Sequence, residues 1–527
     1  MKNKILIPLV ILALLPLNGC SNAASKDKDH DEYILDSVYH WKEDDEENKQ
    51  KHSYFSNGEC KTCNWNKEYS NFYYSRNNEE ETITGYKGKK EIVEIPNIKY
   101  GGRPITRVYI QSAKIVSLKL SDTIRYINME GNPYIETITN VNKDLEVEIA
   151  GFRNCYKFSG FDGKIGKFGI SSFVNSAISH IELSEDSELT SIPQEAFQNT
   201  KLINVNFNNI KSVGIDAFNG CTNLKSATFT LDEESYFSIG DNSFAGCTAL
   251  SNFSFPSNAT KLYLGKECFK DCTSLTSINI TAETFSTYGY GNQFDGCTNL
   301  QTINTDKIKY YMPFMFLNSG IKSLSLADNV VIYKRAFQDI EEVTSPSYGF
   351  IKTYYDGTTS NEPFHSNAFS SSTLKKVTFG EKLYSTYFSD YLFEGSSYLE
   401  NITIPDGIET LGEGCFDGCN RFKSVVLPTS IKQIKKNCFI DTNCTGFDYN
   451  TNKFIYDNID VFYKGDETSW KQVKVESGVS GNGVDSTTKE QIYFDFHNFK
   501  MFYYSETKPT DSSLNYWHYD NGIVTKW

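Results

Sequence analysis

The chain has 527 residues and a formal net charge of −14 at pH 7, which argues against nucleic acid and anionic membrane surfaces as electrostatic partners. With glycine counted in place of tyrosine, about 39% of the residues are apolar, below the roughly 45–50% of an average globular protein. This deficit favours one thin body with much surface and little core over three ordinary domains.

Residues 1–19 carry the pattern of a bacterial export signal. Two lysines precede an apolar stretch from Ile5 to Leu17, which is shorter than the about 20 residues that cross a bilayer. The sequence Leu-Asn-Gly-Cys that ends at Cys20 resembles the lipobox of bacterial lipoproteins. The resemblance implies that Cys20 becomes the acylated first residue and holds the chain at the membrane. An ordinary signal peptide is the alternative.

Residues 20–70 predict an acidic, flexible tether. Eleven acidic residues and five lysines lie between positions 21 and 60, and such a run repels itself into an extended chain. Cys60 and Cys63 stand near the end of this segment, outside any repeat. A local disulfide between them is the first interpretation and a free thiol pair the second. Two cysteines are too few for zinc, which takes four ligands, so no metal site is predicted.

Beyond these segments the chain repeats itself. The motif Phe-x-Gly-Cys, as in Phe218-Asn219-Gly220-Cys221, returns at intervals of about 24 residues. A fixed period of this size is the signature of a solenoid, in which each unit buries its apolar face against its neighbours. Met129 takes the place of the Phe in an early unit. One Phe marks each later unit: Phe152, Phe173, Phe197, Phe218, Phe244, Phe269, Phe294, Phe316, Phe337, Phe369, Phe393, Phe416 and Phe439.

Each unit contains a short alternating run about seven residues beyond its Phe, such as Leu399-x-x-Ile402-x-Ile404. Alternation at period two predicts a strand with one buried face. A second apolar pair, as in Ile408-x-x-Leu411, stands just before the next Phe. We therefore expect one parallel strand per coil, a second short extended piece, and a tight helical turn that carries the Phe.

This pattern resembles the BspA-like leucine-rich-repeat proteins of bacterial cell surfaces, over about residues 110–450. The resemblance implies a mostly β solenoid at 116–450, a short β N-terminal cap at 71–115 and a small aromatic-rich C-terminal capping module at 451–527. It also implies an exported lipoprotein that binds an extracellular protein, as in adhesion to host or matrix proteins. It supplies no binding residues. We expect a monomer.

The cysteines of the repeat fall in two recurring positions, both of which favour a small apolar side chain. Equivalent side chains of adjacent coils point in parallel, so buried thiols are expected rather than disulfides. One position directly precedes the Phe, and the other lies three residues after it: Cys221, Cys247, Cys272, Cys297 and Cys419.

Two features break the repeat and are therefore candidate binding sites. An insertion between Phe337 and Phe369 carries four aromatic side chains that would anchor a partner or else pack on neighbouring coils. They are Tyr348, Phe350, Tyr354 and Tyr355. In the C-terminal module, capping is the first interpretation, and stacking of a glycan on Trp517 or Tyr519 is the second.

No pattern of catalytic residues emerges. The seven histidines lack the H-E-x-x-H spacing, and the nucleophile-elbow motif G-x-S-x-G is absent. The Gly-rich segment 478–483 is expected to be a loop. The sequence thus predicts a lipid-anchored, non-enzymatic surface protein without cofactor that binds another protein. The alternative is a surface lipoprotein that binds or handles carbohydrate through its C-terminal module.

Overall fold

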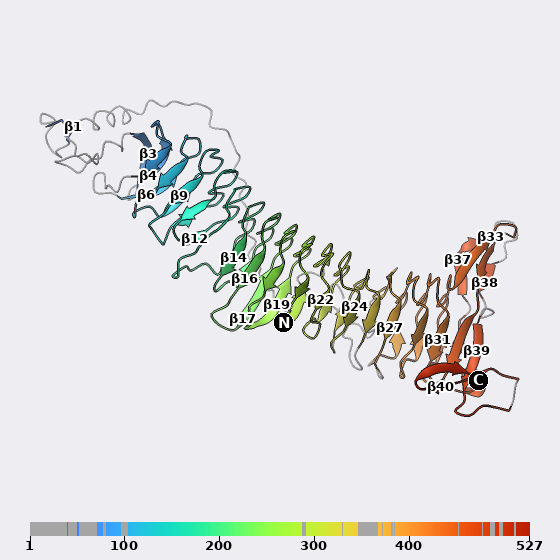
Figure 1. Ribbon diagram of the computed structural model, residues 1–527. Coiled ribbons are helices and arrows are strands. Elements are labelled where there is room, and N and C mark those ends of the chain that lie inside the picture. The colour runs from blue at the N-terminus through green and yellow to red at the C-terminus, as the bar shows by residue number, and fades with distance from the viewer. Residues whose placement is uncertain are drawn as a thin grey trace, which may run out of the picture. The chain divides into compact units, whose positions relative to one another are not determined.

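The computed structural model describes residues 39–40, 50–51, 71–76, 81–95, 104–286, 291–328, 330–345, 367–371, 373–380, 383, 385–451, 453–476, 478–484, 491–494, 499–510 and 513–527. The chain divides into two compact units, Met1–Tyr73 and Tyr74–Trp527. In the first unit, β1 (Tyr39–His40) pairs antiparallel with β2 (Gln50–Lys51). Strand β3 (Phe72–Arg76) spans the division between the units. The second unit is a solenoid whose strands follow one another along the chain (Figure 1).

Each coil of the solenoid contributes to two rows of short, mostly parallel strands, because two separate apolar pairs face its interior. Row A contains the strand formed by the alternating run that lies beyond each Phe. Its strands up to the middle of the chain are β5 (Ile92–Glu94), β7 (Ser117–Lys119), β9 (Thr137–Thr139), β11 (Gly160–Asp162), β14 (Asn204–Phe207), β16 (Ser226–Phe229), β18 (Asn252–Ser254), β20 (Ser277–Ile278) and β22 (Thr302–Ile303). It continues with β24 (Ser323–Ser325), β26 (Glu342–Thr344), β27 (Lys376–Thr378), β29 (Asn401–Thr403), β31 (Ser424–Leu427), β35 (Ile459–Tyr463) and β39 (Phe499–Tyr504).

Row B contains the strand that precedes each Phe. Its strands are β4 (Glu81–Tyr86), β6 (Ile105–Tyr109), β8 (Tyr126–Asn128), β10 (Glu146–Val147), β12 (Lys167–Phe168), β13 (Ser191–Ile192), β15 (Ser212–Val213), β17 (Ser235–Ile239), β19 (Ala259–Leu264) and β21 (Glu283–Ser286). The remainder are β23 (Tyr310–Tyr311), β25 (Val331–Ile332), β28 (Tyr387–Phe388), β30 (Thr410–Leu411), β32 (Gln433–Ile434) and β36 (Lys474–Val475). The second extended piece of each coil is therefore a strand in its own right, where the sequence predicted one strand per coil.

The Phe of each coil forms a continuous ladder inside the solenoid. Ring centroids of Phe218 and Phe244 lie 5.0 Å apart, those of Phe244 and Phe269 5.5 Å, and those of Phe269 and Phe294 5.6 Å, with ring planes within 10° of parallel. The four side chains are fully buried. This spacing is close to the separation of neighbouring strands, so one Phe per coil stacks on the next. The solenoid prediction is confirmed.

The cysteines three residues after the Phe are buried and satisfied by the neighbouring coil. The thiol of Cys247 donates to the carbonyl oxygen of Phe218 at 3.2 Å, and that of Cys272 donates to the carbonyl oxygen of Phe244 at 3.2 Å. Met129 occupies the Phe position as predicted, because Cys155 donates to its carbonyl in the same way at 3.1 Å. Nine of the described cysteines are buried and free: Cys155, Cys221, Cys247, Cys268, Cys272, Cys297, Cys415, Cys419 and Cys438.

The segment that carries the Phe is a run of turns rather than a regular helix. The residue two positions before the Phe and the residue two positions after it have positive φ, as in Asp216 (54°) and Gly220 (72°) around Phe218. A left-handed residue interrupts a helix and favours Gly, Asn or Asp. This requirement explains the Gly of the repeated motif and its replacement by Asn199 (57°) in the preceding coil.

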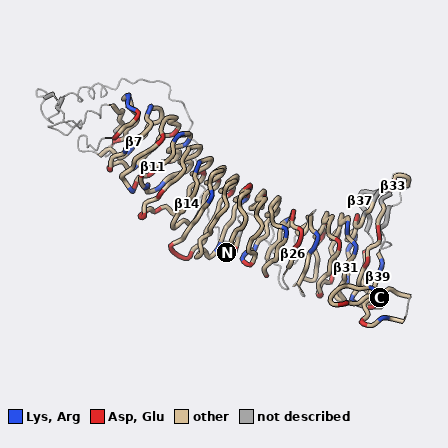
Figure 2. Tube along the Cα trace, viewed as in Figure 1, with Lys and Arg blue, Asp and Glu red and all other residues tan. Residues whose placement is uncertain are grey.

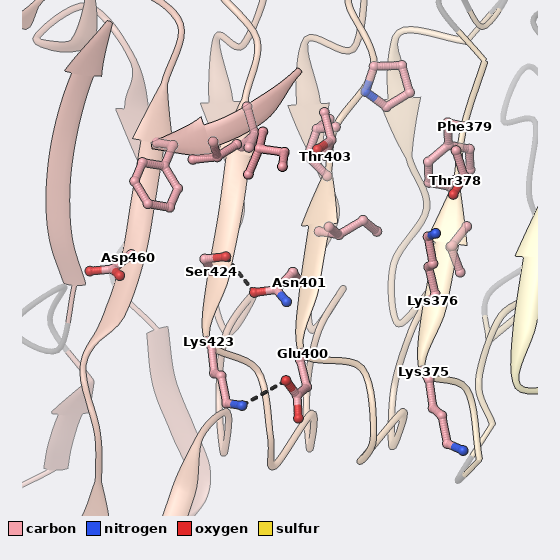
Figure 3. A pocket seen from close by; sticks show the side chains of 18 of the residues that line it. Lys375, Lys376, Thr378, Phe379, Glu400, Asn401, Thr403, Lys423, Ser424 and Asp460 are labelled. Carbon is pink, nitrogen blue, oxygen red and sulfur yellow. Dashed lines mark hydrogen bonds and ion pairs between the residues drawn. The ribbon is translucent and has the colours of Figure 1, made fainter. Parts of the chain in front are cut away.

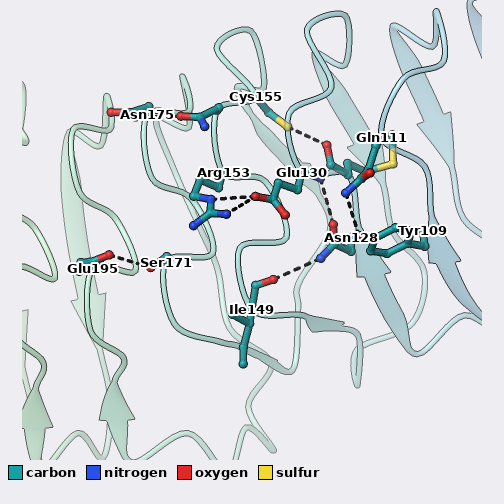
Figure 4. Close-up of polar contacts among 12 residues, drawn as sticks. Tyr109, Gln111, Asn128, Glu130, Ile149, Arg153, Cys155, Ser171, Asn175 and Glu195 are labelled. Atoms are coloured by element: carbon teal, nitrogen blue, oxygen red, sulfur yellow. Dashed lines mark hydrogen bonds and ion pairs between the residues drawn. The ribbon is translucent and has the colours of Figure 1, made fainter. Parts of the chain in front are cut away.

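Polar side chains tie successive coils together where the apolar ladder does not reach. Figure 4 shows Arg153 donating to Glu130 of the preceding coil, with Nε and Oε1 2.9 Å apart. Ser171 donates to Glu195 of the following coil at 2.8 Å. These contacts are exposed or half-buried, so they fix the register of the coils more than they add to stability.

The two ends of the solenoid extend beyond the repeats. Parallel pairing already begins with β4 and β6, inside the segment expected to be the N-terminal cap. At the other end, β35 and β39 extend row A within the C-terminal module. That module also contains α2 (Glu467–Trp470) and the antiparallel hairpin of β37 (Gly478–Val484) with β38 (Gln491–Phe494). A second antiparallel hairpin, β33 (Cys444–Asp448) with β34 (Lys453–Tyr456), begins just before the module. The expectation of a loop at 478–483 was wrong, because these residues lie in β37.

Candidate functional site

A groove with a volume of about 1600 Å³ lies over the outward face of row A at its C-terminal end. Strands β27, β29, β31 and β35 form its floor, and β41 (Ile523–Lys526) forms one wall. Figure 3 shows side chains of neighbouring floor strands side by side, from Asp460 through Ser424 and Asn401 to Lys376.

The floor is polar because every second residue of a floor strand points away from the core. On β29, Asn401 and Thr403 are exposed and Ile402 between them is buried. On β31, the Ser424 hydroxyl donates to Asn401 Oδ1 at 2.6 Å. The floor therefore presents hydroxyl and amide groups at a regular spacing.

The wall arises because the C-terminal end of the chain turns back over row A. Strand β40 (Tyr516–Asp520) pairs parallel with β39 and antiparallel with β41. A two-residue Asn-Gly turn joins β40 to β41, with Asn521 (φ 49°) and Gly522 (φ 81°) both left-handed, as a tight hairpin of this kind requires.

The hairpin is held in place by a small apolar cluster. Trp517 packs with Val426, Phe462 and Phe502, and Val524 of β41 packs against this cluster. The indole Nε1 of Trp517 donates to the carbonyl of Tyr463 at 2.9 Å. The wall is thus anchored on the strands that it covers.

Positive charge exceeds negative charge around the groove, although the whole chain is acidic. Along the unit, charges of both signs are interspersed (Figure 2). Six basic and three acidic residues line the groove: Lys375, Lys376, Arg421, Lys423, Lys464 and Lys526 against Glu400, Asp406 and Asp460.

The three acids of the groove each have a basic partner. Lys423 pairs with Glu400 at 2.7 Å, Lys464 with Asp406 at 2.9 Å and Lys526 with Asp460 at 2.5 Å. These pairs are partly exposed, so each adds little to stability.

Two of the remaining bases have no acidic partner within the part of the chain that the structure describes. Lys376 lies beside Glu342 in the strand register, yet no ion pair joins them. The Arg421 guanidinium lies over the ring of Tyr398 at 4.1 Å from its centroid. The third base, Lys375, pairs with Glu341 outside the groove at 2.5 Å, which holds the pKa of Glu341 below its ordinary value. The groove therefore offers two cations that are available to an anionic ligand.

The chemistry of these side chains suits binding by hydrogen bonds and charge. Among the described residues, no group of three or more His, Cys, Asp or Glu side chains is placed to hold a metal ion. Within the same residues, no helix is long and apolar enough to cross a membrane.

Most of the site residues predicted from sequence fall outside the described residues. This holds for Cys20, for Cys60 and Cys63, and for the four aromatics of the insertion: Tyr348, Phe350, Tyr354 and Tyr355. Those predictions stand as they were.

Trp517, one of the two residues named for the alternative of glycan stacking, is not accessible to a glycan. Trp517 is fully buried at 0% exposure, because its indole packs in the cluster with Val426, Phe462 and Phe502. Tyr519 is 40% exposed, but its ring packs edge-on against Trp517 with centroids 4.9 Å apart.

The groove itself was not predicted. Lys375 was recognisable as an outward polar strand position, but Lys376 and Arg421 gave no signal of their own. The Asn521-Gly522 dipeptide between two short alternating runs is a hairpin signal that could have located the turn, although the sequence analysis did not use it. Nothing in the sequence indicated that this hairpin lies over β31 and β35.

The class of protein follows from the ladder, the two strand rows and the comparison with known families. The model of the BspA type leucine-rich-repeat region matches residues 131–235, 226–344 and 355–466, in six copies. More than half of the chain is covered, so the chain belongs to the BspA-type leucine-rich-repeat family. No curated protein matches the chain.

Solved structures of similar fold come from several bacteria. A leucine rich cell surface protein of Faecalibacterium prausnitzii A2-165 is 16% identical, with 77% of this chain and 96% of that one covered and a TM-score of 0.30. A leucine-rich repeat protein of Bacteroides ovatus is 16% identical, with 77% and 89% covered and a TM-score of 0.38. The pneumococcal vaccine antigen PcpA is 15% identical, with 77% and 95% covered and a TM-score of 0.29.

Proposed function

We propose that this chain is an exported, non-enzymatic surface protein that is anchored through a lipid on Cys20 and binds an extracellular protein with the outward face of row A. The observation that carries the proposal is the groove of about 1600 Å³ at the end of that face. Solenoids bind along extended faces built from many coils, and a walled groove on such a face gives a partner both floor and side contacts.

Three further features support a protein partner. The floor offers regularly spaced hydroxyl and amide groups from Asn401, Thr403 and Ser424. The rim carries Tyr398, which is exposed beside Arg421, and Tyr and Arg are enriched at the energetic centres of protein interfaces. The burial of Trp517 weighs against the glycan-binding alternative, since it removes one of the two stacking residues on which that alternative rested.

Partner binding is tested with one substitution inside the groove and a matched one outside it. Thr403→Trp places a large side chain on the floor of the groove, while Asn206→Trp changes the equivalent position of β14, far along the same row. Both positions are exposed strand residues where tryptophan is tolerated. The measurement is surface plasmon resonance of the full chain against a panel of purified extracellular matrix proteins.

We expect at least one matrix protein to bind, and Thr403→Trp to weaken that binding tenfold or more while Asn206→Trp leaves it unchanged. Equal binding by both variants would place the site outside the groove. The aromatic insertion at Tyr348–Tyr355 is then the next candidate.

Anchoring is tested separately in bacteria that express the full chain. Cys20→Ala should move the protein from the membrane fraction to the soluble fraction and abolish incorporation of a fatty-acid analogue. Ser21→Ala next to it is the matched control and should change neither result. Unchanged membrane partition of the Cys20→Ala variant would contradict lipid anchoring.

A further inference from the structure

The wall of the groove is an open sheet edge. Strand β41 is the last strand of its sheet, and within the described residues it pairs only with β40. Four residues of β41 line the groove, whereas the lining includes none from β40. The unpaired edge of β41 therefore faces into the groove.

The hydrogen-bond pattern of the hairpin identifies which backbone groups are free. The amide of Trp527 donates to the carbonyl of Tyr516, and the bonded pairs of an antiparallel ladder recur at every second residue. Thr525 and Ile523 thus bond to β40, while the N–H and C=O groups of Val524 and Lys526 point away from it. Exposed edges of this kind are normally blocked, because they pair with any extended chain.

The side chain of Val524 packs on the cluster around Trp517, which holds the edge in place over the floor. Lys526 is fixed in the same way, by its ion pair with Asp460 at 2.5 Å and by its position 4.7 Å from the ring centroid of Phe502. A strand that added to this edge would meet a rigid template, so little ordering of the protein would oppose binding.

The charges around the open edge of β41 indicate which kind of segment would bind there. Bases outnumber acids by six to three among the lining residues, and Lys376 and Arg421 lack an ion pair among the described residues. An acidic segment would neutralise these two cations, whereas a basic one would be repelled.

From this edge and this charge we propose that the groove binds an extended acidic peptide segment of the partner protein by β-strand addition to β41. This inference rests on the proposed function and specifies the chemistry of its partner. The backbone of the segment pairs with Val524 and Lys526, and its carboxylates reach Lys376 and Arg421.

The binding probe is a fluorescent ten-residue peptide of alternating Glu and Thr, titrated into the full chain and followed by anisotropy. The matched probe replaces each Glu with Lys. We expect saturable binding of the acidic peptide and at least tenfold weaker binding of the basic one. Lys376→Glu and Arg421→Glu should each weaken the acidic peptide tenfold or more, while Lys225→Glu, on the same row outside the groove, should leave it unchanged.

Strand addition is distinguished from charge attraction by blocking backbone donors. N-methylation of every second residue of the peptide removes the donors on one edge only, so one of the two N-methylated series should lose binding and the other should keep it. On the protein, Val524→Pro removes an outward amide without removing a β40 bond, and should abolish binding that Val524→Ala retains. Melting temperatures of both variants show whether the hairpin remains folded.

Equal affinity of both N-methylated series would overturn strand addition. Heparin binding that depends on Lys376 and Arg421, without peptide binding, would overturn the peptide assignment in favour of a sulfated polysaccharide. If Thr403→Trp abolishes binding of a matrix protein that the acidic peptide does not displace, the proposed function stands and this inference fails. If Thr403→Trp has no effect on that binding, the groove fails as the site in both.

Discussion

The Phe ladder makes a quantitative prediction about one coil. Phe244 is fully buried between Phe218 and Phe269, with centroids at 5.0 and 5.5 Å, and it meets Phe253 edge-on at 5.1 Å. Truncating a buried Phe to Ala costs about 3–5 kcal/mol, and the loss of aromatic pairs at about 0.5–1.5 kcal/mol each places this site at the upper end. We expect Phe244→Ala to lower local stability by about 5 kcal/mol. Phe244→Leu keeps most of the apolar volume and should cost about 1–2 kcal/mol.

The assay is native-state hydrogen exchange with peptide-resolved mass spectrometry. Because each coil contacts only its neighbours, protection should fall roughly 4000-fold at about 1.4 kcal/mol per tenfold change, and only near the substitution. The backbone amide of Phe218, which donates to the carbonyl of Ser243 at 2.7 Å, should show the loss. The amide of Phe416, which donates to Cys438 at 2.8 Å, should exchange as in the unmodified chain. A uniform loss along the chain, or a local loss below tenfold, would refute this account of the ladder.

Three further predictions concern other parts of the chain. Under denaturing, non-reducing conditions Cys247 and its counterparts in the repeat should alkylate as free thiols, and bridged cysteines in a peptide map would contradict the parallel geometry. Burial and the nearby Asp441 and Glu394 raise the pKa of Asp417 to about 6. Because the folded state holds this proton more tightly than the unfolded state, the free energy of unfolding should fall as the pH rises from about 4 to about 6. In urea denaturation, Asp417→Asn should remove this dependence and add about 1 kcal/mol at pH 7 after allowance for solvent screening. If Thr403→Trp leaves partner binding unchanged, the insertion becomes the candidate site, and deleting 347–360 should then weaken partner binding tenfold or more with little change in melting temperature. A large fall in melting temperature would instead place those aromatics in the core.

The repeat could be predicted from sequence because the residues that determine the structure of each coil lie within that coil. Phe218, Gly220 and Cys221 occupy fixed positions of one coil, and each position has a single physical demand: a stacked ring, a left-handed turn and a small thiol. When such demands recur with a fixed period, the pattern alone predicts which residues meet between coils.

The groove could not be predicted in this way, because it depends on contacts between distant segments. Lys526 reaches Asp460 across 66 positions, and Trp517 donates to Tyr463 across 54. The aromatic residues of the C-terminal module gave the same signal whether they stacked on a ligand or packed in a core. Only the position of the hairpin over β31 and β35 distinguishes ligand stacking from core packing, and that position leaves no periodic pattern in the sequence.

The thiol-to-carbonyl bonds between coils have a consequence for the export proposed above. Desolvation raises the pKa of the Cys247 thiol well above its ordinary value, and the thiolate is the form that attacks a disulfide or an oxidant. A folded coil therefore keeps its cysteine unreactive in an oxidising compartment, whereas a coil that has not yet folded exposes a reactive thiol. The chain is vulnerable to wrong cross-links only during folding. Each coil that stacks on its predecessor removes one more nucleophile from the reaction, so the completion of the solenoid is itself the protection against scrambled disulfides.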